Sequence, residues 1–80
     1  MSKQKIYLEP RNEFDNCIIK ETDTSVTYGV EQILDMLSYE YSTDNPELSV
    51  DDLFLMALEY FEYNIEPLRH YYALEFIEVT

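Results

Sequence analysis

The segment from Ser49 to Ile65 limits the possible folds most. Its apolar side chains occupy more of the circumference of a helix than one neighbouring element can bury. At about 100° per residue they span an arc of roughly 200°. A helix this apolar must be covered on two sides, so we expect it at the centre of a small domain. The residues of this arc are Leu53, Phe54, Met56, Ala57, Leu58, Tyr60, Phe61 and Ile65.

Capping signals mark both ends of this helix. Ser49 is a typical N-cap residue, with Asp52 three positions later and Leu48 placed to pack on Leu53. Asn64, followed by Pro67, indicates the C-terminal end, because proline cannot continue a helix.

A second amphipathic helix is expected to begin after Gly29 and to end in the polar loop Ser42–Glu47. Its apolar arc is about half as wide, roughly 100°. The arc consists of Val30, Ile33, Leu34, Leu37 and Tyr41.

The remaining segments have the patterns of strands. Residues 5–9 form the first, residues 17–21 and 25–28 form a hairpin after a turn, and residues 72–79 form the last, with apolar side chains on both faces. We expect one domain, residues 1–80, of the α+β class. Its predicted architecture is a small antiparallel sheet of about four strands, in the order βββααβ, with two helices packed on one face.

The charge of the chain is uneven. The net charge is −12, and no Lys or Arg lies between Glu21 and Leu68. Solubility of a small domain needs a magnitude of only about 2–8. Direct binding to nucleic acid is excluded, because neutralising phosphates requires clustered bases. Anionic membranes are excluded on the same ground.

The sequence offers no chemical site. Gly29 is the only glycine, which argues against a glycine-rich phosphate loop. His70 has no partners at metal-ligand spacing, and residues 44–52 lack the order of a calcium loop. Cys17 is interpreted as a small buried hydrophobe in a strand. We therefore expect no enzyme, no cofactor and no metal.

The single cysteine permits no intrachain disulfide, which favours an intracellular setting. No stretch is typical of a signal peptide, and no apolar run reaches the roughly 18 residues of a membrane span. We therefore expect a cytoplasmic protein.

Three stretches follow patterns of the form FDxAII, YxxExIL and AxEYxEYNI, namely residues 14–19, 28–34 and 57–65. In order and spacing they resemble small acidic proteins encoded by bacteriophages and prophages. The resemblance covers residues 8–66. After Asn64 the chain departs from the pattern, which often continues there with a glycine-rich turn and a Trp or Tyr. The resemblance implies a viral origin and a bacterial host, and it assigns no functional residue.

The outer face of the helix from Ser49 is the candidate binding surface. One interpretation is an ordinary solvated face. The other is a surface that imitates the phosphate spacing of nucleic acid and occupies a basic groove of a host protein, as an anti-CRISPR or anti-restriction inhibitor would. Charge would come from Asp51, Asp52, Glu59, Glu62 and Glu66, and Leu55 and Tyr63 would be the anchors.

Two further expectations concern association. Tyr39 lies off the apolar arcs and is, with Tyr63, the tyrosine most suited to an interface. The alternative to inhibition is a homo-oligomeric accessory phage protein, such as a homodimer, that associates through the two-faced strand 72–79. The sequence does not identify the partner.

Overall fold

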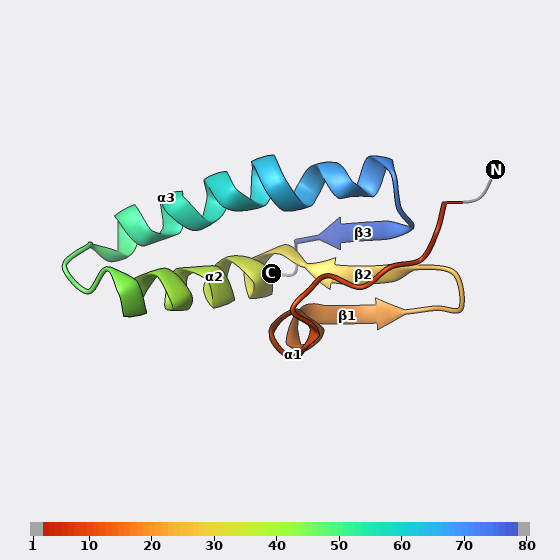
Figure 1. Ribbon diagram of the computed structural model, residues 1–80, viewed down its shortest axis with the longest axis horizontal. Helices are drawn as coiled ribbons and strands as arrows, with labels where there is room; N and C mark the ends of the chain where they lie inside the picture. Colours follow the sequence, from red (N-terminus) through yellow and green to blue (C-terminus); the bar gives the residue numbers. More distant parts are fainter. Residues whose placement is uncertain (1–2, 79–80) are drawn as a thin grey trace.

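The computed structural model describes residues 3–78 and is an α+β structure of helices and one small sheet (Figure 1). A 3₁₀ turn, Asp15–Cys17, follows the first helix. A π turn, Phe61–Ile65, and a second 3₁₀ turn, Glu66–His70, follow the third helix. The helices and strands are α1 (Arg11–Phe14), β1 (Ile18–Glu21), β2 (Val26–Gly29), α2 (Val30–Asp44), α3 (Val50–Tyr60) and β3 (Leu74–Ile77).

The sheet has three strands in the order β1-β2-β3, and β2 is central. β1 pairs with β2 antiparallel, whereas β3 pairs with β2 parallel. All four residues of β2 are buried, and Val26 and Tyr28 have no exposed surface. Burial on both faces is consistent with the β-branched and aromatic side chains of this strand, whose one polar side chain, Thr27, is also buried.

The first predicted strand, residues 5–9, is absent from the sheet. Gln4 forms only one isolated bridge with Tyr72, and the segment then runs over β2 (Figure 1). Leu8 is buried, and its backbone N–H donates to the Tyr28 hydroxyl at 2.9 Å. The alternating apolar residues therefore reflect packing against the core, which gives the same pattern as strand pairing.

The prediction of an antiparallel sheet was wrong because the helix from Ser49 continues past its expected end. The π turn and the second 3₁₀ turn extend the helical path from Phe61 to His70, and Pro67 is accommodated in the first turn of the 3₁₀ segment. The chain thus returns to the far end of the sheet before β3 starts (Figure 1). A strand that starts from that end runs parallel to β2.

The two long helices form an antiparallel hairpin that extends beyond the sheet rather than packing on one face of it. α2 continues in the direction of β2, and α3 returns beside it (Figure 1). The molecule is accordingly elongated, with extents of 46 × 25 × 21 Å. The predicted N-cap is confirmed: the Ser49 side chain accepts from the backbone N–H of Asp52 at 3.2 Å.

Smaller boundaries also differ from the sequence expectations. The turn predicted before Cys17 is the helix α1 followed by a 3₁₀ turn, so Cys17 precedes β1 instead of lying in a strand. The helix α2 takes in part of the predicted loop and ends at Asp44. The last strand is confined to Leu74–Ile77, and Val79 of its predicted range lies outside the described residues.

Aromatic side chains join the helical layer to the sheet. The Phe61 ring meets the Phe76 ring edge-on, with centroids 5.3 Å apart, and the Phe76 ring lies 6.1 Å from that of Tyr28. Each such pair contributes about 0.5–1.5 kcal/mol beyond its buried area. The buried core around them comprises Leu8, Phe14, Cys17, Val26, Tyr28, Ile33, Leu34, Leu37, Ala57, Phe61, Ile65 and Leu74.

We predict that Tyr28→Phe destabilises the fold by about 1–3 kcal/mol, because it leaves the buried N–H of Leu8 without an acceptor. Chemical denaturation measures the loss. Tyr63→Phe is the matched control, since Tyr63 is exposed and its hydroxyl makes no described hydrogen bond within residues 3–78. Equal stability of the two variants would show that Tyr28 does not hold the N-terminal segment.

Candidate binding surface

Six of the seven residues predicted to bind a partner lie together on the outward side of α3 and the π turn. Leu55 has an exposed fraction of 55% and Tyr63 of 78%. The four members within α3 fall inside an arc of about 100°, opposite the buried Ala57. The six exposed residues are Asp51, Asp52, Leu55, Glu59, Glu62 and Tyr63.

The π turn keeps the buried side of this helix aligned. In a regular α-helix, residues four apart differ by about 40° in direction around the axis. Side chains that repeat every four residues therefore turn gradually away from the element on which the first of them packs. The wider π turn counteracts that drift. Phe61 and Ile65 therefore stay buried in line with Ala57, and Tyr63 stays on the exposed side.

Glu66 does not belong to this free acidic face. Its carboxylate accepts from the Arg69 guanidinium three residues later, and the residue is partly buried. Arg69 therefore neutralises the charge that the sequence analysis assigned to partner binding. The same pairing occupies Arg69, the only base after residue 20.

The helix α2 adds as much charge as α3 to the same projection. Residues 30–60, which we call the α2–α3 hairpin, carry eight carboxylates and no base. Fifteen residues of α2 extend about 22 Å, so the hairpin presents one carboxylate per about 2.8 Å of its length. Duplex DNA presents one charge per about 1.7 Å. The contribution of α2 and the connecting loop is Glu31, Asp35, Glu40, Asp44 and Glu47.

None of the three ion pairs within residues 3–78 involves a carboxylate of the α2–α3 hairpin. Lys5 pairs with Glu21 at 2.8 Å, and Arg11 pairs with Asp15 at 3.2 Å. The Lys5 ammonium lowers the pKa of Glu21, which also accepts from the Tyr7 hydroxyl. Lys5 and Arg11 thus neutralise carboxylates at the sheet end, and the carboxylates of the hairpin are left without an ion pair among the described residues.

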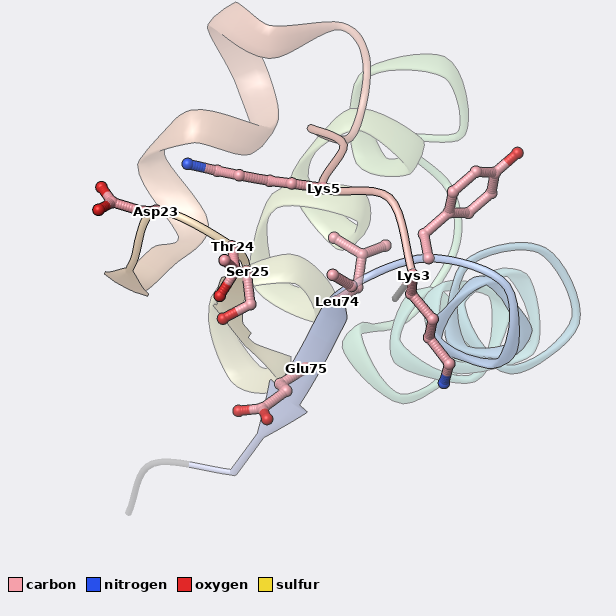
Figure 2. A pocket seen from close by; sticks show the side chains of 9 residues that line it. Lys3, Lys5, Asp23, Thr24, Ser25, Leu74 and Glu75 are labelled. Atoms are coloured by element: carbon pink, nitrogen blue, oxygen red, sulfur yellow. The ribbon is translucent and has the colours of Figure 1, made fainter. Parts of the chain in front are cut away.

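One hollow lies at the sheet end, between the N-terminal segment, the β1–β2 turn and the start of β3 (Figure 2). It measures about 650 Å³ and contains two lysines, yet their amines are already bonded. Lys3 donates to the carbonyl of Arg69, and Lys5 donates to Glu21 and to the carbonyl of Thr22. In Figure 2 the two side chains point away from one another, so they do not form a joint anion site.

The expectation that the apolar helix is covered on both sides is met only in part. Leu53 and Ala57 are buried, but Phe54 keeps an exposed fraction of 44% and Tyr60 of 42%. Each of these side chains lines a hollow beside α3, Phe54 next to α2 and Tyr60 next to Tyr41. Both residues belong to the apolar arc that was predicted to face the core. The width of the apolar arc of this helix, roughly 200°, is the sequence signal that could have revealed these hollows, because so wide an arc is difficult to bury completely in a small domain.

The carboxylates of Glu13 in α1 and Glu40 in α2 form a pair that was not predicted from the sequence. Burial, reinforced by the neighbouring carboxylates of Glu13 and Asp44, raises the pKa of Glu40. The pair borders a hollow of about 620 Å³ that Cys17 and Tyr39 also line. Burial likewise raises the pKa of the Cys17 thiol, which disfavours the reactive thiolate.

The described residues contain no cluster of three or more His, Cys, Asp or Glu that could hold a metal ion. His70 lies exposed at the end of the second 3₁₀ turn. Within the same part of the chain, no helix is both long enough and apolar enough to cross a membrane.

Comparisons with protein-family models, with curated proteins and with solved structures found no match to this chain.

We predict that Glu40→Gln stabilises the protein at pH 7 and has little effect near pH 4. The raised pKa means that the folded state favours the protonated form. The stability gained from that proton is present below the ordinary pKa of 4.5 and is lost as the pH rises through the raised pKa. Thermal unfolding at both pH values measures the difference. Glu47→Gln is the control, because it removes the same charge from an exposed position.

Equal effects of the two substitutions at pH 7 would contradict a local cause at Glu40. The gain would then come from the lower net charge alone.

Proposed function

We propose that this protein is an inhibitor that inserts its α2–α3 hairpin into a basic, nucleic-acid-binding channel of another protein. The observation that supports the proposal most is the charge of the hairpin: eight carboxylates, no base, and no ion pair to any of them among the described residues. A solvated face needs no such concentration on one projecting end.

The shape of the molecule favours a channel over a flat surface as the target. The hairpin extends beyond the sheet (Figure 1). Its carboxylates lie on several sides. Asp51 and Glu59 lie on the outward side of α3, Asp35 beside the hollow at Phe54, and Glu40 beside α1. A projection that is negative all round can meet bases on every wall of a channel, as nucleic acid does.

The proposed partner is a host protein of a phage or prophage, such as a CRISPR effector or a restriction enzyme, in line with the resemblance of residues 8–66. On this proposal the protein has no catalytic activity, and its effect is steric and electrostatic. Leu55 and Tyr63 are the exposed side chains that would supply apolar contact within the acidic face.

The alternative of self-association through the last strand has less support. The outer edge of β3 is flanked by the π turn and the second 3₁₀ turn, as both figures show. The strand therefore does not offer the long open edge that strand-to-strand pairing requires.

We predict that the protein, immobilised and exposed to a nuclease-treated bacterial lysate, retains a nucleic-acid-binding protein and displaces duplex DNA from it. Because the contact is electrostatic, affinity should fall roughly tenfold or more between about 50 and about 300 mM salt. Glu47→Lys combined with Glu59→Lys, two exposed acids of the hairpin, should abolish displacement. Fluorescence anisotropy of labelled DNA measures it.

The matched control reverses two exposed acids at the sheet end, Glu9→Lys with Asp23→Lys. Both double variants have the same net charge of −8, so only the location of the change differs. Binding that is insensitive to salt, or that is lost equally in both variants, would contradict the proposal.

A further inference from the structure

An open apolar groove runs along α3 on the side that faces the start of α2 and the end of β3. It consists of two adjoining hollows of about 370 and 360 Å³, which share Val30 and Glu78. The groove is the uncovered flank of the apolar arc of α3. Its floor comprises Val30, Leu34, Phe54, Leu58 and Phe76.

The rim of the groove is acidic along both sides. Glu31 and Asp35 project from α2, Glu62 from the π turn, and Glu78 from the residue after β3. The only base that lines it, Arg69, is already paired with Glu66. A complementary occupant must therefore combine apolar side chains with flanking Lys or Arg side chains.

The backbone conformation of the occupant can also be inferred from the elements that line the groove. They are mostly side chains of helices, and helix backbones have no free N–H or C=O groups to offer an extended peptide along their length. An occupant buried there must satisfy its own backbone. A helix does so internally, whereas an extended segment would need a free strand edge.

The dimensions suit a short helix. The apolar lining residues from Phe54 in α3 to Phe61, which also lines the second hollow, cover about 10 Å along the helical axis. That is also the distance between the first and last of three apolar side chains at positions i, i+4 and i+7 of a partner helix. Three such anchors would reach both hollows.

We infer that this groove binds a basic amphipathic helix of the partner protein. The inference rests on the proposed function, since it specifies the chemistry of that partner. It places the apolar anchors of the partner over Phe54 and Leu58, and its Lys or Arg side chains against Glu31, Asp35 and Glu78. The hairpin and the groove are then two parts of one interface.

The test uses a synthetic, fluorescently labelled helical peptide with Leu at i, i+4 and i+7 and Lys at the exposed positions. A second peptide has the same composition in an order that destroys the apolar face. The full chain should bind the first peptide, and Phe54→Ala should weaken this binding by about tenfold. Val50→Ala is the control, because Val50 is an exposed apolar residue of α3 that lines neither hollow of the groove.

A second pair of variants tests the rim without touching the apolar floor. Glu31→Gln with Asp35→Asn should weaken binding more than Asp51→Asn with Asp52→Asn, although each pair removes two charges. Amide chemical shifts on peptide addition should change at Val30, Phe54 and Phe76. Equal affinity for both peptides, unchanged affinity in Phe54→Ala, or shifts confined to the outward side of α3 would each overturn the inference.

The outcomes separate this inference from the proposed function. Peptide binding in the groove, together with failure to displace DNA from any captured protein, leaves the inference standing and contradicts the inhibitor proposal. If Phe54→Ala displaces DNA as effectively as the unaltered protein, the inhibitor proposal stands and the inference about the groove is contradicted.

Discussion

The continuation of the third helix beyond Tyr60 determines the arrangement of the whole molecule. Through the π turn it keeps Phe61 and Ile65 buried in line with Ala57. It carries Phe61 onto Phe76, and it brings the chain back to the end of the sheet from which β3 must run parallel to β2. A helix that ended at Tyr60 would lack the contact of Phe61 with Phe76.

The sequence predicted those parts of the fold that local chemistry decides. The Ser49 cap, the strand-to-helix junction at Gly29 and the two long helices follow from side-chain type and spacing. The hairpin of β1 and β2 followed as well, but the rest of the sheet did not. Apolar alternation in residues 5–9 is produced by packing over β2, and the direction of β3 depends on helical turns around Pro67 that standard stop signals argue against. Both errors involve contacts between segments far apart in sequence.

The candidate surface was predictable to a similar degree. Helical spacing alone places Asp51, Leu55 and Glu59 on one exposed side. It does not reveal that Glu66 is neutralised by Arg69, because that contact arises in a 3₁₀ turn which the sequence analysis did not expect. Nor does it separate buried from uncovered members of a wide apolar arc. Leu53 is buried, whereas the neighbouring Phe54 is exposed in a hollow beside α2.

The negative charge is unevenly distributed along the long axis, because the α2–α3 hairpin carries −8 of the net charge of −12. The paired bases Lys5 and Arg11 belong to the sheet end, whereas the projecting end carries carboxylates alone. In the field of a positively charged body such a molecule rotates before contact, with its hairpin leading. Productive collisions then become a larger share of all collisions, and the rate of complex formation can rise without any change in the bonds of the final complex.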